Sequence, residues 1–257
     1  IGNLDRFSPI LEDIRYTCCV QEVPADSIIS EFGDGQFEVN LNHIDDALLA
    51  ADHAVLFKRI VRSVARNHDH LASFMAKPYG DKIGSGMHVH FSVLDQNGNN
   101  IFSNGTKTGS SSLLHAVGGL LQAMQGSMLI FAPHLNSWRR LRPRSCAPVA
   151  ANWGYENRTV SIRIPDSPDE ARRIEHRVSG ADANPYLVIA AILSAALYGM
   201  EHQVEPGEES TGNTYANPRA EQGLPPQWYE AIHAMRTSVL MRELLGDAFV
   251  DLFTAIK

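Results

Sequence analysis

The chain has 257 residues, of which 44% are hydrophobic and 20% are charged, and its formal net charge is -7. This composition is ordinary for a globular protein and argues against long disordered or fibrous segments, while the length allows one large domain or two small ones. The acidic balance argues against a protein that binds nucleic acid through phosphate contacts, so local arginine clusters are expected to meet small anions.

Cysteine content and hydropathy indicate a cytoplasmic location. The three cysteines, Cys18, Cys19 and Cys146, are odd in number and lack the CxxC spacing, which favours a reducing compartment. The most apolar run, residues 185–200, is shorter than the roughly 20 residues that span a bilayer, so it predicts a buried helix and no membrane partner. No signal peptide is recognisable at the start.

The first half of the chain predicts two extended pieces, two helices and a strand. Residues 27–41 form the extended pieces, hinged at Gly33-Asp34-Gly35. A helix with apolar residues three and four apart follows over residues 45–68, with Asp45 or Asp46 as its cap. Residues 82–93 predict a strand, the Asn97-Gly98 pair predicts a hairpin turn, and residues 112–132 predict a helix interrupted by glycines.

The second half predicts an irregular stretch, two strands and three helices. Residues 136–158 have little periodicity, whereas 158–165 and 171–180 alternate as strands do. Asn184 and Pro185 are the expected start of the apolar helix. Two helices, 226–239 and 240–256, are expected to end the chain, and Tyr215 is expected to be an exposed loop tyrosine.

Two pairs of side chains could bind metal. His88 and His90 lie at positions i and i+2 of the predicted strand and therefore share a face. Glu31 and Glu38 are seven residues apart, but the glycine kink between them can reset the strand phase so that both carboxylates converge. Taken alone, each pair can equally be a set of solvated side chains.

A third group combines arginines with a carboxylate. Arg163 interrupts a run of apolar strand residues, and Arg173, Glu175 and Arg177 share a face of the next strand. Charged ladders on buried strands are uncommon unless they are paired or bind something. Carboxylates and imidazoles for divalent cations, with arginines for phosphate oxygens, indicate phosphoryl transfer from a nucleotide, with a structural ion-pair network as the alternative.

The order of these motifs resembles that of the glutamine synthetase family. The similar segments are EFGDGQFEV, KPYGDKIGSGMHVHFS, NSWRRLRP, NRTVSIRIP and ARRIEHRVSGADANPYL, which together span most of the chain. The resemblance implies an α+β fold with a curved antiparallel β-sheet flanked by helices, and an ATP-dependent ligase that joins glutamate to an amine.

The resemblance also implies a role for each matched residue. Glu31 and Glu38 match ligands of a first Mg2+ or Mn2+ ion, and His88 and Glu175 match ligands of a second. The remaining matches are His90, Ser92 and Arg173 near the nucleotide, Arg158 and Arg163 at the phosphates, Arg140 and Arg177 at the glutamate carboxylates, and Gly84 in the loop that meets the amino acid. The implied chemistry transfers the γ-phosphoryl group of ATP to the side-chain carboxylate of glutamate, and the amine then attacks the acyl phosphate. Arg158 is expected to stabilise the phosphoryl oxygens during transfer.

Two departures from the family pattern concern the amine. Cys146 stands where ammonia-using members carry a glutamate, and a thiol with an ordinary pKa near 8.5 replaces that carboxylate poorly. Ile83 stands where those members often have an asparagine. Both departures resemble the γ-glutamylpolyamine synthetase branch, so the expected acceptor is an organic amine or polyamine.

A third departure concerns the extent of the chain. The small N-terminal β-grasp domain of the family and its Glu-x-Glu strand are not recognisable before Glu31, so residues 1–257 are expected to be a C-terminal catalytic domain that is inactive alone. The full-length parent is expected to be a ring-shaped homo-oligomer. The alternatives are a glutamine synthetase that uses ammonia, a noncatalytic protein that binds glutamate or nucleotide, and a zinc-dependent hydrolase built on His88 and His90.

Overall fold

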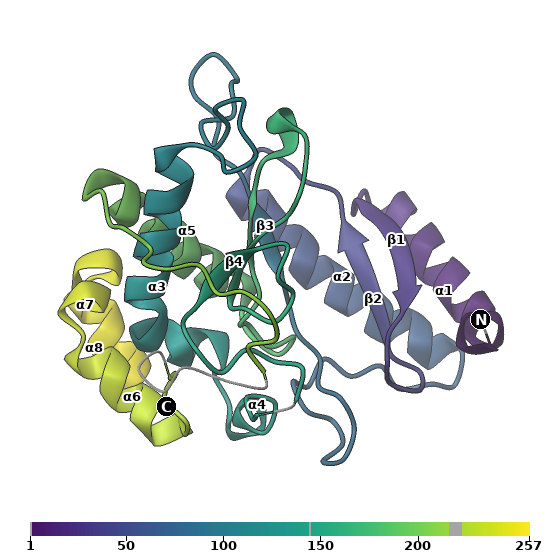
Figure 1. The fold of residues 1–257 in the computed structure, drawn as a ribbon. Helices are drawn as coiled ribbons and strands as arrows, with labels where there is room; N and C mark the ends of the chain where they lie inside the picture. The colour runs from purple at the N-terminus through teal and green to yellow at the C-terminus, as the bar shows by residue number, and fades with distance from the viewer. Residues whose placement is uncertain (1, 144, 216–222) are drawn as a thin grey trace. The chain divides into compact units, whose positions relative to one another are not determined.

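The computed structural model describes residues 2–143, 145–215 and 223–257. The chain forms two compact units (Figure 1). The first comprises Ile1–Phe74 and Pro78–Ile83, and the second comprises Met75–Lys77 and Gly84–Lys257.

The first unit packs two helices and a hairpin around a small apolar cluster. Its elements are α1 (Gly2–Val20), β1 (Ala25–Ser30), β2 (Phe37–Leu41) and α2 (Ala47–Asn67). The hairpin and α2 confirm the prediction, and Asp46 is the cap of α2 because its Oδ1 accepts hydrogen bonds from the backbone N–H groups of Leu48 and Leu49. The sequence analysis missed α1, which contains Pro9 in its interior, a residue that ordinarily ends a helix.

A four-stranded mixed sheet organises the second unit. Its strands are β3 (Val89–Phe91), β4 (Trp153–Tyr155), β5 (Ile162–Ile164) and β6 (Ile174–His176), in the spatial order β3-β6-β5-β4. The β3–β6 and β5–β6 pairs are antiparallel. The expected α+β class is confirmed, but β4 pairs with β5 in parallel, so the sheet is not wholly antiparallel. Strands β3, β5 and β6 are each shorter than the stretch that predicted them, 82–93, 158–165 and 171–180.

The described part of the second unit also contains several helices. They are α3 (Ser111–Phe131), α4 (Leu135–Trp138), α5 (Pro185–Glu201), α6 (Trp228–Thr237), α7 (Val239–Leu245) and α8 (Asp247–Ala255), with a short 3-10 turn η1 (Asp169–Ala171). Where two helices were expected after α5, the described residues form α6, α7 and α8, because Gly246 has a φ of 83° and separates α7 from α8. The stretch expected to be irregular contains α4 and β4.

Helices α3 and α5 form the centre of the second unit (Figure 1), and α3 also packs on α6. The glycines expected to interrupt α3 lie within one continuous helix. A Cβ at Gly119 would lie 2.1 Å from the backbone oxygen of Ala195, so the glycine permits close backbone contact. In the described part of the chain, α3 alone is long and apolar enough to cross a membrane, but most of it is buried in the core of the unit.

Candidate functional site

One row of residues crosses the sheet of the second unit and carries the candidate site. His90 of β3 is paired with Glu175 of β6, and Glu175 is paired with Arg163 of β5. Residues directly opposite one another on neighbouring strands point to the same face. The three side chains predicted to bind metal and phosphate therefore lie side by side, and Gly154 of β4 continues the row.

Glu175 is a buried carboxylate surrounded by cationic and imidazole groups. Its Oε2 accepts a hydrogen bond from Arg163 Nη1 at 2.8 Å, and its Oε1 accepts one from Arg177 Nη1. His88 Nδ1 lies 3.2 Å from the same Oε1. Burial alone would raise the pKa of Glu175, but the hydrogen bond from His88 and the charge of Arg177 hold that pKa well below its ordinary value. Glu175 is therefore anionic across the physiological pH range.

His88 and His90 converge on Glu175 as expected from their spacing. His88 precedes β3, and His90 Nε2 lies 3.7 Å from Glu175 Oε1. Arg173 Nε donates a hydrogen bond to His90 Nδ1 at 3.2 Å, which requires that nitrogen to be unprotonated. Burial lowers the pKa of His90 to about 4, with Glu175 opposing this shift and Arg173 reinforcing it. His90 is thus neutral at pH 7.

Arg140 is held against a glycine loop at one end of this site. It follows α4, is 5% exposed, and donates from Nη1 to the backbone oxygen of Val178 at 2.8 Å. A Cβ at Gly86 would lie 2.7 Å from Arg140 Nη2 and 3.5 Å from His88 Nε2. A Cβ at Gly84 would lie 2.9 Å from Arg140 Cγ. The loop therefore fits the buried guanidinium closely only because both positions lack side chains.

The other predicted residues of the second unit lie around the same strands. Arg177 is half-buried beyond the end of β6, and its Nη2 donates to the backbone oxygen of Arg158 at 3.0 Å. The Arg158 side chain is exposed. Ser92 is exposed directly after β3, and Arg173 directly precedes β6. Arg158 and Arg177 are thus brought together, with the Arg158 side chain directed to solvent.

Glu31 and Glu38 belong to the hairpin of the first unit. Ser30 pairs with Phe37 and Ile29 pairs with Glu38, and the Glu31 N–H donates to the Gln36 oxygen at 2.9 Å. Glu31 is therefore opposite Gln36, which shares a face with Glu38 two residues on. The two carboxylates lie on one face of the hairpin, as the kink at residues 33–35 was expected to allow. Their role as metal ligands stays a prediction.

The second unit offers two donors to a divalent cation, namely one imidazole nitrogen of His88 and one carboxylate oxygen of Glu175. No cluster of three or more histidine, cysteine, aspartate or glutamate side chains suited to a metal occurs among the described residues. Mg2+ commonly uses one or two protein carboxylates and takes its other ligands from phosphates and water. The donors of the second unit therefore fit a cation that arrives with nucleotide phosphates, and do not fit a zinc site closed by protein ligands.

The sequence analysis missed Glu156 and misjudged Tyr215. Arg163 Nη2 lies 3.0 Å from Glu156 Oε1, so this arginine joins two carboxylates. Tyr215 is half-buried rather than exposed, and its hydroxyl lies 3.1 Å from the Cys146 backbone oxygen and 3.3 Å from the Arg158 backbone oxygen. Sequence spacing gives no signal for either contact, since the Tyr215 contacts join residues more than fifty positions apart and Glu156 lies at a turn with a φ of 50°.

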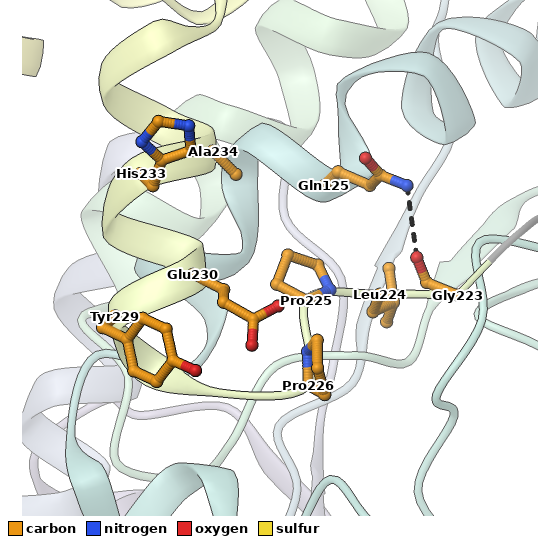
Figure 2. Close-up of a pocket in the computed structure, with 9 residues that line it drawn as sticks. All are labelled: Gln125, Gly223, Leu224, Pro225, Pro226, Tyr229, Glu230, His233 and Ala234. Carbon is orange, nitrogen blue, oxygen red and sulfur yellow. Dashed lines mark hydrogen bonds between the residues drawn. The ribbon is translucent and has the colours of Figure 1, made fainter.

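A separate open groove lies beside α6 and contains none of the predicted site residues. Figure 2 shows Pro225, Pro226 and the side chains of Tyr229 and Glu230 along it, with the hydrogen bond of 3.2 Å from Gln125 Nε2 to the Gly223 oxygen at one end. The described residues that line this groove include no arginine and none of the predicted metal ligands, so the sheet rather than this groove carries the candidate site.

Comparison with known proteins agrees with the motif resemblance. The family model described as "Glutamine synthetase, catalytic domain" matches residues 1–257. The chain is 39% identical over 259 residues to gamma-glutamylputrescine synthetase of Escherichia coli strain K12, covering 100% of the chain and 54% of that protein. It is 36% identical over 253 residues to glutamate–isopropylamine ligase of a Pseudomonas species, covering 97% of the chain and 55% of that protein.

A solved structure has the same fold. The structure described as a GmaS complex with ADP in conformation 1 superimposes with a TM-score of 0.90 and 32% sequence identity, covering 99% of the chain and 60% of that protein. The chain thus spans little more than half the length of the relatives it matches.

Proposed function

Because the chain belongs to the glutamine synthetase catalytic-domain family, we propose that it is the catalytic part of a longer ATP-dependent ligase that forms a γ-glutamyl amide from glutamate and an amine. In the proposed reaction, the side-chain carboxylate of glutamate attacks the γ-phosphorus of ATP and ADP leaves. The amine then attacks the γ-carbonyl carbon of the acyl phosphate, loses a proton, and expels inorganic phosphate.

The observation that carries this proposal is the set of groups around Glu175. One buried carboxylate is bound by Arg163 and Arg177 and approached by His88, on the same sheet face as His90. Such a cationic, partly buried surface suits the triphosphate of a nucleotide and a glutamate carboxylate. A purely structural ion-pair network would not require the two imidazoles beside it.

The matched residues divide among the substrates as follows. Arg140 and Arg177 bind the carboxylates of glutamate, and the backbone of Gly84 meets the amino acid. Arg158 and Arg163 bind the transferred phosphoryl group, while His90, Ser92 and Arg173 lie along the nucleotide. Mg2+ or Mn2+, when bound by His88 with Glu175 and by Glu31 with Glu38, supplies positive charge that neutralises the phosphate oxygens.

We propose an organic amine or polyamine as the acceptor. Cys146 offers a thiol where the ammonia-using members of the family carry a carboxylate that attracts and deprotonates an ammonium ion, so this position does not supply that anion. Two relatives named for organic amines, gamma-glutamylputrescine synthetase and glutamate–isopropylamine ligase, support the same acceptor class.

The proposal for the whole protein extends to its assembly and location. The chain is proposed to require the N-terminal part of the parent for activity, because the relatives are almost twice as long. The parent is proposed to form a ring-shaped homo-oligomer. Its location is proposed to be cytoplasmic, in keeping with three cysteines that carry free thiols.

The test measures phosphate release from ATP by the intact parent protein, with Mg2+, glutamate, and either ammonia, putrescine, isopropylamine or ethanolamine. Release that needs both glutamate and an organic amine is expected. Release with ammonia alone would overturn the acceptor class but keep the ligase. ATP binding without release for any amine would replace the ligase with a noncatalytic nucleotide-binding protein.

A further inference from the structure

A short segment, residues 210–215, runs beside the turn that carries Arg158 and is fastened to both neighbours of that arginine. We call this segment the strap. Asn157 Nδ2 donates to the Ser210 oxygen at 2.9 Å and to the Gly212 oxygen at 3.0 Å. On the other side, Thr214 Oγ1 donates to the Thr159 oxygen at 2.6 Å, and the Thr214 N–H donates to Thr159 Oγ1 at 3.0 Å.

The strap also lies directly against the sheet. The Ser210 N–H donates to the Trp153 oxygen at 2.8 Å, and a Cβ at Gly154 would lie 2.7 Å from the Ser210 oxygen. Gly154 is opposite Arg163 in the sheet row. The missing side chain at Gly154 therefore lets the strap approach the strand next to a proposed phosphate-binding arginine.

Tyr215 is the last described residue of the strap, and its hydroxyl reaches two turns of the candidate site. The oxygen lies 3.1 Å from the Cys146 carbonyl and 3.3 Å from the Arg158 carbonyl. The single hydroxyl proton is shared between these two acceptors. Arg177 Nη2 donates to the same Arg158 carbonyl at 3.0 Å, so one backbone oxygen is held by both side chains.

The Tyr215 hydroxyl is well suited to act as a neutral hydrogen-bond donor. Burial raises the pKa of Tyr215 above its ordinary value, although the charge of Arg177 opposes that shift. The hydroxyl therefore keeps its proton at pH 7. Cys146 has a φ of 59°, a left-handed conformation that is uncommon for a residue with a side chain, so its turn benefits from an external contact that holds it in place.

We propose that Tyr215 is a positioning residue for the acceptor step. Its hydroxyl holds the Cys146 turn beside Arg158 and Arg177, and this turn forms the surface that the amine contacts. This inference rests on the proposed function, in which Cys146 stands at the acceptor end of the site. The contact is made to the Cys146 backbone, so it positions the turn and leaves the thiol side chain free to face the amine.

The test compares Tyr215→Phe with Tyr155→Phe in the intact protein. The control removes a hydroxyl of the same kind, because Tyr155 donates to the Thr108 oxygen at 2.7 Å. Loss of one hydrogen bond of about 1.4 kcal/mol corresponds to about a tenfold change in a binding constant. In Tyr215→Phe, the KM for the amine should rise about tenfold and the KM for ATP should change less than twofold. Tyr155→Phe should leave both constants at the parent values.

Hydrogen exchange supplies a readout that does not depend on turnover. The backbone amides of residues 145–147 should exchange about tenfold faster in Tyr215→Phe and at the parent rate in Tyr155→Phe. Faster exchange with an unchanged KM for the amine would mean that Tyr215 stabilises the structure only, and would overturn its positioning role. Unchanged exchange would show that the Tyr215 hydroxyl does not hold the Cys146 turn in place. A parent protein without ligase activity would instead remove the proposed function, and the acceptor role of Tyr215 with it, while exchange would still decide whether the hydroxyl holds the turn.

Discussion

At the scale of single residues, Glu175 is the group on which the candidate site depends. It is 2% exposed and binds two arginines, so removing its charge takes the buried anion away from both cations, of which only Arg163 keeps a second carboxylate partner among the described residues, Glu156. Breaking a buried ion pair in this way costs about 3 kcal/mol or more. We therefore expect Glu175→Gln to lower the free energy of unfolding by about 3 kcal/mol, measured by urea denaturation of the intact protein.

Glu156 provides the matched control for that change. It pairs with the same Arg163 but is exposed, and exposed ion pairs contribute less than about 1 kcal/mol. Glu156→Gln should therefore change the free energy of unfolding only slightly. Equal losses for the two variants would contradict the central place given to Glu175.

Gly86 lies close to both Arg140 and His88, and its lack of a side chain leaves room for the guanidinium of Arg140. In Gly86→Ala the new methyl group would meet the flexible end of Arg140, so the guanidinium must move. Loss of a charged hydrogen bond is worth about 1.5–3 kcal/mol, so the KM for glutamate should rise about tenfold or more while that for ATP stays near the parent value.

Gly80→Ala is the control for this prediction, because nothing lies within 4 Å of the added Cβ. Its kinetic constants should equal those of the parent protein. A rise in the KM for ATP as large as that for glutamate in Gly86→Ala would show a general disturbance of the loop and contradict the specific link to Arg140.

The three thiols should differ in reactivity. Cys18 is 1% exposed, whereas Cys19 and Cys146 are exposed. Burial raises the pKa of the Cys18 thiol above its ordinary value, so the folded protein resists its ionisation. Above pH 9 the unfolded chain releases this proton more readily than the folded one, so the contribution of Cys18 to stability falls as pH rises further.

Alkylation with iodoacetamide at pH 8, followed by mass spectrometry, measures this difference. Cys19 and Cys146 should be modified in the native protein, and Cys18 only after denaturation. Rapid native modification of Cys18 would mean that α1 opens readily from the cluster that buries it.

Most residues of the site could be predicted because strand alternation and motif order depend on local sequence. The shared face of His88 and His90, and the reset of phase between Glu31 and Glu38, followed from a period of two and a glycine kink. Glu156 and Tyr215 could not be predicted in this way. Each contacts its partner only because loops fold back on one another, and no periodic pattern in the local sequence predicts such a contact.

At the scale of secondary-structure elements, the start of α2 offers a direct test. The sequence allowed Asp45 or Asp46 as the cap, and only Asp46 accepts the hydrogen bonds of Leu48 and Leu49, at 2.8 and 3.0 Å. Loss of such a cap costs about 1 kcal/mol. Asp46→Ala should therefore lower the unfolding free energy by about that amount, whereas Asp45→Ala should leave it nearly unchanged.

Differential scanning calorimetry of the two variants checks this prediction. The midpoint should fall for Asp46→Ala alone. A fall of the same size for Asp45→Ala would mean that the loss comes from a change in net charge near the helix start rather than from the cap.

Elements with a strong local period were predicted better than elements made by tertiary contact. Helices α2 and α5 have clear caps and apolar patterns, and both lie close to their expected bounds. Strand β4 has three residues and depends on parallel pairing with β5. No local sequence pattern predicts this pairing. Helix α1 continues through Pro9, and its buried residues, Ile14 and Cys18, come after that proline and pack in the apolar cluster of the first unit.

At the scale of the whole molecule, the two units differ in the size of their apolar cores. The cluster of the first unit contains five buried residues: Ile14, Cys18, Val23, Ile60 and Val64. The cluster of the second unit is several times larger and includes most of α3. Since local stability follows buried apolar area, amides of the first unit should open at a lower free energy than those of α3 and α5.

Native-state hydrogen exchange resolved by mass spectrometry measures this order. Peptides from α2 should exchange before peptides from α3, although both helices have 21 residues. Equal protection of the two helices would mean that the first unit receives stabilisation beyond its own cluster, from the remainder of the parent protein.

The contact between Tyr215 and Cys146 has a consequence for how such a protein can diversify. Because the Tyr215 hydroxyl donates to the backbone carbonyl of residue 146, the side chain at this position can change during evolution while the turn keeps its conformation. The left-handed conformation restricts this choice, since glycine, asparagine and aspartate adopt it readily and β-branched residues do not. If Cys146 faces the amine as proposed, single substitutions at this position form a small, well-defined set of variants in which to look for a new range of amines.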